Sequence, residues 1–228
     1  STWLDVGAVS DEVPRLLAAD ATTRVYFEPA ADFTGTVSDV ISFKAWDRNV
    51  IWQQLGVDID GEAAGDWFGR VVKISGDGKT VVGSAPYNDA NNGENTGHVR
   101  VYSWSTETSL WTQKGLDLDG DTPGDHYGNE IAISYDGSIL AIGATHESDT
   151  ETNAGQVRVY RWDEPGHKWI QQGQDINGSA YYQKNGFVRI SGDGSTLAVG
   201  SVGEEFGNAS AAGQVNVFDW NAVTSQWS

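Results

Sequence analysis

Tryptophan recurs along this chain at nearly constant intervals, in two parallel series. Steps of 58 residues separate the members of the first series, and steps of 59, 58 and 58 residues separate those of the second. The two series are Trp46, Trp104, Trp162 and Trp220, and Trp52, Trp111, Trp169 and Trp227. Repetition at a fixed period of tens of residues is the signature of repeat architectures. We therefore expect consecutive copies of one supersecondary unit.

Each copy contains four short extended runs separated by Gly, Asp and Asn, beginning with the copy that opens at Trp52. An Asp-Gly pair lies between two apolar runs in every copy, at Asp77, Asp136 and Asp193. Asp-Gly between apolar runs predicts a tight hairpin, because glycine tolerates positive φ. Four antiparallel strands in about 58 residues match a long propeller blade. The predicted fold class is all-β, with antiparallel, propeller-like repeats.

The last long run of each copy indicates how the strands are covered. In the second copy, Val157 and Val159 point to one face of the predicted strand, and Arg158 and Tyr160 point to the other. Bulky side chains on both faces predict a strand that is covered on both sides, as between stacked blades. We therefore expect both tryptophan series to be structural, with Trp104, Trp162 and Trp220 largely buried.

Phe68-Gly69, followed by Val-Gly-Ser-Ala-Pro86, resembles an FG-GAP repeat, the blade of integrin-α-type β-propellers. Tyr127-Gly128 with Ile-Gly-Ala144 resembles a diverged second copy, whereas Lys184-Asn185 take the expected place of Phe-Gly in the third. The resemblance covers residues 52–220. It implies a propeller-type protein that acts in adhesion at a cell surface.

Residues 1–50 differ from the three blades predicted for residues 51–228. Their sequence resembles the end of a cadherin-like, Ig-type module of large secreted bacterial adhesins. The opening Trp3-Leu-Asp-Val-Gly7 also matches the Trp-x-x-x-Gly that begins each copy, so the segment is alternatively a diverged fourth blade. The absence of methionine indicates a processed or trimmed chain or a fragment.

The charge of the chain restricts its partners. There are 32 acidic residues against 14 Lys and Arg, a formal net charge of −18. Nucleic acid and anionic membranes are therefore not expected as partners, because both require a basic surface. The sequence has no cysteine, which excludes disulfides and thiolate chemistry, and no run long enough to insert into a membrane.

Acidic loops recur between the first and second runs, and carboxylates at alternating positions are ligands for Ca²⁺. The candidate ligands are Asp58, Asp60, Asp66, Asp117, Asp119 and Asp125. The third copy has Asp175 and Asn177, with Tyr182 in place of the last acid. A solvated acidic turn is the alternative, and in FG-GAP repeats the calcium loop follows the Phe-Gly strand. Ca²⁺ is the only cofactor that the sequence suggests.

No catalytic constellation is found. The four histidines do not recur in register, and the sequence has neither an HExxH nor a G-x-S-x-G motif. The Ser-x-Asp-Gly turns at Ser75, Ser134 and Ser191 are interpreted as structural. Other features are surface aromatic residues that could bind sugars, and glycosylation sequons. The aromatic residues are Trp67, Tyr87, Tyr181 and Phe206, and the sequons are at Asn177 and Asn208.

Three functions remain. The first is a non-enzymatic extracellular structural or adhesion protein that assembles with copies of itself into a fibre, by exchange of a terminal strand. The residues expected to carry assembly are Trp3, Leu4, Val6, Gly7, Trp220 and Trp227. The alternative is a binding module for surface glycans or proteins, with or without Ca²⁺. The third is a glycosidase-like enzyme, since paired carboxylates are compatible with the many acidic residues.

Overall fold

A computed structural model of the protein describes residues 53–89, 93–148, 153–179, 183–203 and 213–228. All of them belong to one compact unit, Trp52–Ser228. The predicted module at residues 1–50 lies outside the described residues, as do its assembly residues Trp3, Leu4, Val6 and Gly7. Tyr181, Tyr182, Phe206 and Asn208 also lie outside them. The domain boundary predicted at residue 50 therefore stays a prediction.

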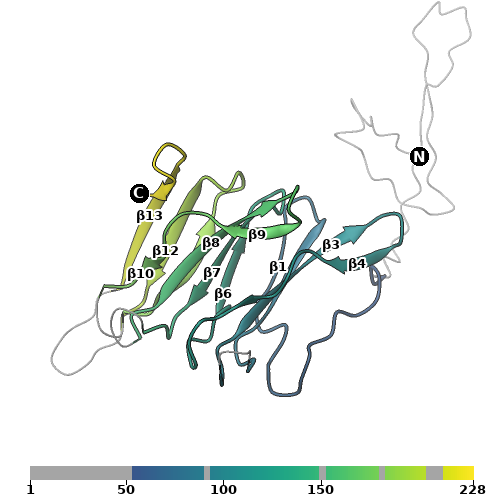
Figure 1. The fold of residues 1–228 in the computed structure, drawn as a ribbon, viewed down its shortest axis with the longest axis horizontal. Helices are drawn as coiled ribbons and strands as arrows, with labels where there is room; N and C mark the ends of the chain where they lie inside the picture. The colour runs from purple at the N-terminus through teal and green to yellow at the C-terminus, as the bar shows by residue number, and fades with distance from the viewer. Residues whose placement is uncertain (1–52, 90–92, 149–152, 180–182, 204–212) are drawn as a thin grey trace, which may run out of the picture. The chain divides into compact units, whose positions relative to one another are not determined.

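The described residues form three antiparallel β-sheets and contain no helix (Figure 1). We call the sheets blades 1, 2 and 3. Blade 1 contains β1 (Val72–Ile74), β2 (Thr80–Ala85), β3 (His98–Ser105), β4 (Leu110–Gln113) and β5 (Leu118–Asp119). Blade 2 contains β6 (Glu130–Ile133), β7 (Ile139–Ala144), β8 (Gln156–Asp163), β9 (Lys168–Gln171) and β10 (Ile176–Asn177). Blade 3 contains β11 (Asn185–Ile190), β12 (Thr196–Ser201), β13 (Gln214–Asn221) and β14 (Gln226–Trp227).

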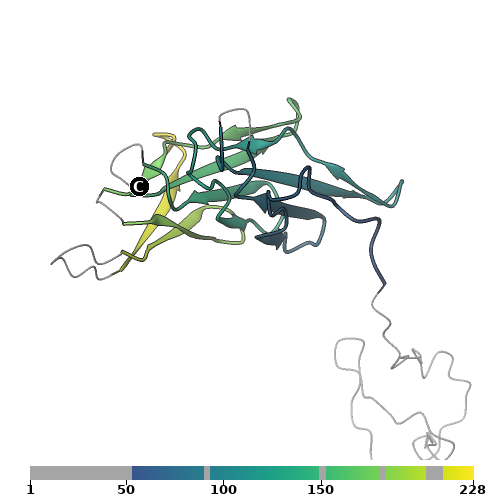
Figure 2. The same ribbon diagram turned by 90° about the horizontal axis from the view of Figure 1, so that it is seen from below.

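The first four strands of each blade pair in chain order, and the blades follow one another along the chain (Figures 1 and 2). In blades 1 and 2 the outer edge is shared by two short strands. β4 and β5 both pair with β3, and β9 and β10 both pair with β8. The all-β, antiparallel, propeller-like fold is thus confirmed. The Trp-x-x-x-Gly segment at Trp111 belongs to the outer edge of blade 1, so each sequence copy spans two sheets.

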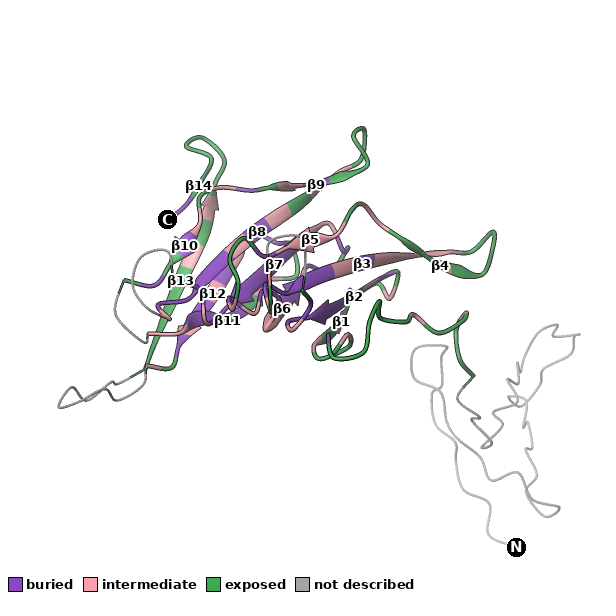
Figure 3. Cartoon of the chain, turned by 60° about the horizontal axis from the view of Figure 1, so that its bottom comes forward, coloured by how far each residue is buried: buried purple, intermediate pink, exposed green. Residues whose placement is uncertain are grey.

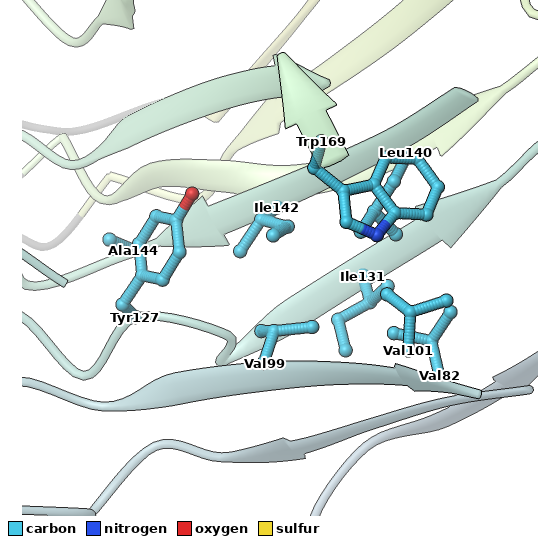
Figure 4. Close-up of a cluster of buried hydrophobic side chains, with 9 residues drawn as sticks. All are labelled: Val82, Val99, Val101, Tyr127, Ile131, Leu140, Ile142, Ala144 and Trp169. Atoms are coloured by element: carbon cyan, nitrogen blue, oxygen red, sulfur yellow. The ribbon is translucent and has the colours of Figure 1, made fainter. Parts of the chain in front are cut away.

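The hydrophobic core lies between blades rather than within them. In the first core, Val82, Val99 and Val101 of blade 1 pack against blade 2, where Ile131, Leu140 and Ile142 face them (Figure 4). In the second core, Val157 and Val159 of blade 2 pack against blade 3, through Val188, Leu197 and Val199. Because β8 contributes valines to one core and Tyr160 to the edge of the other, it is covered on both sides, as predicted.

Each of the three Ser-x-Asp-Gly segments forms a turn with the same hydrogen bonds. In the first, the Ser75 hydroxyl donates to Asp77 at 2.6 Å, and the Thr80 amide donates back to the Ser75 Oγ at 2.9 Å. Asp136 and Asp193 repeat these bonds. The turns are also joined to each other through Tyr135. The Asp77 amide donates to the Tyr135 carbonyl, and the Tyr135 amide donates to the Gly192 carbonyl.

The two tryptophan series form cross-strand pairs, one pair per blade. Trp104 lies opposite Trp111, Trp162 opposite Trp169, and Trp220 opposite Trp227. The prediction that Trp104, Trp162 and Trp220 are largely buried is wrong, because all three are half-buried. Trp169 and Trp227 are the buried members, at 9% and 3% exposure. The reason is that each second-series indole enters the joint with the preceding segment of chain.

A glycine of that preceding segment makes room for each pair. Gly115 has φ of +86°, and an added Cβ there would lie 2.9 Å from the Trp169 ring and 3.1 Å from the Trp162 ring. Gly56 lies similarly close to the tryptophan pair of blade 1, and Gly173 to that of blade 3. The Trp-x-x-x-Gly pattern therefore has a steric cause, because the glycine at its end lies under the next tryptophan pair.

The Phe-Gly position of the third copy lies one residue later than predicted. The Tyr127 amide donates to Thr96, and the equivalent bond in blade 3 runs from Asn185 to Ala154. Asn185-Gly186, not Lys184-Asn185, therefore occupies the position of Phe-Gly. The register was lost in the sequence because the aromatic residue that marks it is absent. Asn185 is buried, and its side chain donates to the Ile176 carbonyl at 2.9 Å.

Candidate functional site

Two carboxylates of the predicted calcium loops are held by Arg100 of β3. Its guanidinium contacts Asp117 at 2.9 and 3.1 Å and also forms an ion pair with Glu62. Gln113 donates a further hydrogen bond to Asp117 at 2.6 Å. Burial alone would raise the pKa of Asp117, but the hydrogen bonds from Arg100 and Gln113 hold that pKa below its usual value.

Blade 2 repeats this arrangement with Arg158 of β8. The guanidinium contacts Asp175 at 3.3 Å and Asp121 at 2.5 Å. It also lies 6.0 Å from the centroid of the Tyr127 ring, within the range of a cation–π contact. Each arginine therefore joins one carboxylate of its own outer edge to one carboxylate of the preceding loop. We call this arrangement the arginine clamp.

At the joint between blades 2 and 3, the arginine of the clamp and the carboxylate of the preceding loop are both replaced. Arg100 pairs with Gly83 in the strand register, Arg158 with Ile142, and the equivalent residue of β13 is Asn216. Ser179 stands where Asp121 stands in the preceding copy. Arginine and acid disappear together, which indicates that they function as a pair.

The other predicted calcium ligands are dispersed. Asp58 and Asp60 are exposed, and Asp58 accepts a hydrogen bond from Gln54 at 2.7 Å. Asp66 and Asp125 are buried, where they accept bonds from Asn88 and from the Thr122 amide. Asp119 is half-buried, and burial raises its pKa.

Within the described residues, one group brings three ligand atoms within 4.8 Å of one another, and it consists of Glu62, His98 and Asp117. Arg100 contacts both of its carboxylates, so a cation there has to displace the guanidinium. Calcium binding by the acidic loops stays a prediction. The clamp was not predicted from the sequence, although the arginine of Val-Arg-Val stands at the same position in the first two copies.

The outward face of blade 3 exposes valines whose equivalents are buried elsewhere. Val215 and Val217 of β13 are 71% and 64% exposed, whereas Val157 and Val159 of β8 are fully buried. Phe187 and Val202 border the same face and line a shallow groove beside Val215. The colours of Figure 3 show the change from buried β8 to largely exposed β13. We call this surface the trailing face.

The opposite face of blade 1 is exposed in the same way. Val72 and Ile74 of β1 are 58% and 60% exposed, whereas Ile131, the equivalent of Val72 in blade 2, is fully buried. A groove on this face is lined by Val57, Phe68, Val72, Val81 and Trp111 among others. We call this surface the leading face. The two faces correspond to the two sides of the joint between blades 1 and 2.

The described assembly residues Trp220 and Trp227 lie at the joint between blades 2 and 3. The indole of Trp227 donates to the Gln172 carbonyl at 2.8 Å, and its main chain bonds to the Gln174 side chain. β14, which ends at Trp227, pairs with the end of β13 near Trp220. Both tryptophans are thus engaged within the chain.

Four rings form a row across the loops of blades 1 and 2. The ring centroids of Trp67 and Tyr87 are 4.6 Å apart, those of Tyr87 and His126 4.7 Å, and those of His126 and His146 4.7 Å. Trp67 is 58% exposed, which confirms its prediction as a surface residue, and the other three are half-buried. We call this set the ring row. The predicted sequon at Asn177 is on an exposed residue of β10.

The family model described as FG-GAP repeat matches residues 57–102. The predicted resemblance is thereby confirmed for the first copy. The second and third copies repeat its strand order and its turns. No curated protein matches the chain by sequence. No helix in the described part of the chain has the length and hydropathy needed to cross a membrane.

Solved structures of low sequence identity share parts of the arrangement. A putative 6-phosphogluconolactonase from Bacteroides fragilis is 16% identical, with a TM-score of 0.46 over 73% of this chain and 38% of its own. A periplasmic gluconolactonase from Pseudomonas aeruginosa is 18% identical, with a TM-score of 0.42 over 65% of this chain and 38% of its own. This chain thus spans less than two fifths of the length of either protein.

Proposed function

We propose that this chain is a non-enzymatic structural or adhesion protein of the cell surface, and that it assembles with further copies of itself blade against blade. The observation that supports the proposal is the exposure of the trailing and leading faces. Each is the repeat equivalent of a surface that is buried between blades 1 and 2. The non-enzymatic part of the proposal is supported by the FG-GAP match and by the ion pairs of Arg100 with Glu62 and Asp117.

The trailing face of one copy is suited to pack on the leading face of the next. Val215 and Val217 would take the role that Val157 and Val159 have on blade 2, and Val72 would take the role of Ile131. Burying such side chains stabilises by about 1.5–3 kcal/mol each. Because the two faces differ, the contact is head-to-tail, which builds a filament unless the rotation between copies closes a ring.

Main-chain pairing supports the same joint. In blades 1 and 2 the start of the third strand pairs with β5 or β10, whereas Gln214 and Val215 have no such partner among the described residues. Ile59 and Asp60 are the sequence equivalents of β5. In the next copy they would supply the missing pairing by β-augmentation. Strand donation by Trp3–Gly7, predicted from the sequence, is a second route to the same joint.

Sedimentation velocity over a range of protein concentrations tests the proposal. The wild type should form concentration-dependent oligomers that strengthen with salt, because a net charge of −18 opposes contact between copies. The double variant Val215→Asp, Val217→Asp should remain monomeric and folded. Val223→Asp is the matched control, since Val223 is 95% exposed in the β13–β14 turn. A wild type that is monomeric at every concentration, or oligomers that survive the double change, would contradict blade-to-blade assembly.

A further inference from the structure

The ring row is built from equivalent positions of two successive copies. Trp67 and His126 each precede the Phe-Gly position, while Tyr87 and His146 each follow the second strand of their blade. Four side chains from four separate loops thus reach one line across the joint. The third copy has Lys184 and Gly203 at the two positions, so the row is confined to blades 1 and 2.

The backbone under the row is strained at the two positions where a ring precedes Phe-Gly. Trp67 has φ of +57° and His126 has φ of +54°, in the left-handed region that bulky residues rarely adopt. Glycine or asparagine would meet this backbone requirement with less strain. The equivalent Lys184 of the third copy also has a positive φ, of +50°, so the left-handed backbone belongs to the repeat. This backbone does not require a ring, and the rings of Trp67 and His126 are therefore not explained by it.

The row combines one exposed indole with three half-buried rings that carry polar atoms. Trp67 at its end is more than half exposed, so ring surface there is accessible to a ligand. Successive rings are tilted by 40–53°, so the row is not a flat stack. Tyr87 and the two histidines carry hydroxyl and imidazole groups that can donate or accept hydrogen bonds. An aromatic surface followed by a line of hydrogen-bonding groups suits a ligand with an apolar ring face and hydroxyl edges.

The charge of the protein restricts the ligand further. Asp66 and Asp125 directly precede Trp67 and His126, Asp89 lies near Tyr87 in the chain, and the net charge is −18. An anionic sugar would be repelled by this field. We propose that the row of Trp67, Tyr87, His126 and His146 is a carbohydrate-binding site that takes a neutral oligosaccharide. The site does not depend on assembly, because it lies within blades 1 and 2 of one chain.

Titration of the whole protein with four neutral hexasaccharides tests this site. The probes are cellohexaose, maltohexaose, mannohexaose and chitohexaose, followed by tryptophan fluorescence and calorimetry. At least one should bind, and hexagalacturonate should bind more weakly. Trp67→Asn should weaken that binding by about tenfold or more. Its melting temperature should stay the same or rise, because asparagine tolerates the left-handed backbone.

Two further variants make the result decisive. Tyr135→Ala removes an aromatic residue that is 61% exposed at the β6–β7 turn, at the other end of β7 from His146, and should leave binding unchanged. His126→Asn keeps the backbone conformation and should weaken binding, so it also serves if Trp67→Asn fails to fold. Absence of binding to all four neutral probes would overturn the proposal. Stronger binding of hexagalacturonate, or affinity unchanged in both Trp67→Asn and His126→Asn, would also overturn it.

Discussion

The indole of Trp169 donates a hydrogen bond to the main-chain carbonyl of Lys114 at 2.8 Å. Trp169 belongs to blade 2 and Lys114 to the outer edge of blade 1, so the bond crosses the joint between them. Trp111 and Trp227 make the same bond to Leu55 and Gln172. The Lys114 ammonium lies 5.0 Å and 5.5 Å from the Trp162 and Trp169 ring centroids, so the joint also contains a cation–π contact.

Replacing Trp169 with alanine should destabilise the protein more than the same change at Trp162. Trp169 is buried and loses both its packing and its hydrogen bond, so we expect a cost of about 3–5 kcal/mol. Trp162 is half-buried and should cost clearly less. Chemical denaturation followed by circular dichroism measures both. Equal costs, or a larger cost at Trp162, would show that the second tryptophan series does not carry the joint.

The missing arginine clamp can be installed at the joint between blades 2 and 3. The double variant Ser179→Asp, Asn216→Arg should raise the free energy of unfolding by about 0.5–1 kcal/mol, the range of partly exposed ion pairs. Each single change should bring no gain, since it adds a charge without its partner. A double-mutant cycle from denaturant unfolding gives the coupling energy. A coupling energy of zero would mean that the clamp does not transfer between copies.

The stability lost on removing the arginine of an existing clamp should depend on the presence of its two carboxylates. Arg158→Met leaves Asp121 and Asp175 without their cation, and we expect a loss of about 1–3 kcal/mol. The loss should shrink when Asp121→Asn and Asp175→Asn are already present. Urea unfolding of the four combinations measures this. The clamp would be refuted as a stabilising contact by a loss that is independent of the two acids.

The turn carboxylates should make the fold sensitive to acid. Hydrogen bonds from Ser191 and from the Ser195 amide lower the pKa of Asp193 to about 2, and the pKa values of Asp77 and Asp136 are also lowered. A pKa depressed in the folded state gives stability that is present above 3.8, the unfolded value, and lost as pH falls towards 2. Asp193→Asn should therefore flatten the fall of melting temperature between pH 4 and pH 2. An unchanged pH profile in this variant would contradict the assignment.

Calcium binding can be tested against the clamp. If Ca²⁺ occupies the acidic loops, Arg100→Met should strengthen its binding by freeing Glu62 and Asp117, and Asp58→Ala with Asp117→Ala should abolish it. Calorimetric titration measures the three proteins. A flat titration for both the wild type and Arg100→Met would exclude these loops as calcium sites.

The fold was predictable because its signals are local and repeated. Each Asp-Gly at Asp77, Asp136 and Asp193 forms the predicted turn, and Val157 and Val159 share a face as their alternation indicates. The burial of each tryptophan side chain was not predictable in this way. Spacing identified the pairs, but the member that enters the joint is the one whose indole bonds to the preceding segment, as Trp169 does to the Lys114 carbonyl.

The candidate sites depended on contacts between copies, which a reading within one copy does not reveal. Arg100 meets Glu62 from a loop 38 positions earlier in the chain, so the carboxylates seemed available for calcium. The ring row likewise gathers residues from four loops. Trp67 was correctly predicted as a surface residue, whereas Tyr87 is half-buried. His126 and His146 were considered only as catalytic groups, and their alignment with the aromatic residues required the structure.

The bond between turns through Tyr135 uses main-chain atoms on both sides. The indole bonds across the joints likewise end on main-chain carbonyls, those of Leu55, Lys114 and Gln172, three different side chains. Because a carbonyl is the same whatever residue carries it, these contacts impose no sequence on the neighbouring copy. Duplication or loss of one whole unit would leave the turn and indole bonds of the new neighbours intact. A lineage of such chains could therefore change its number of blades in a single genetic step, with sequence divergence following afterwards.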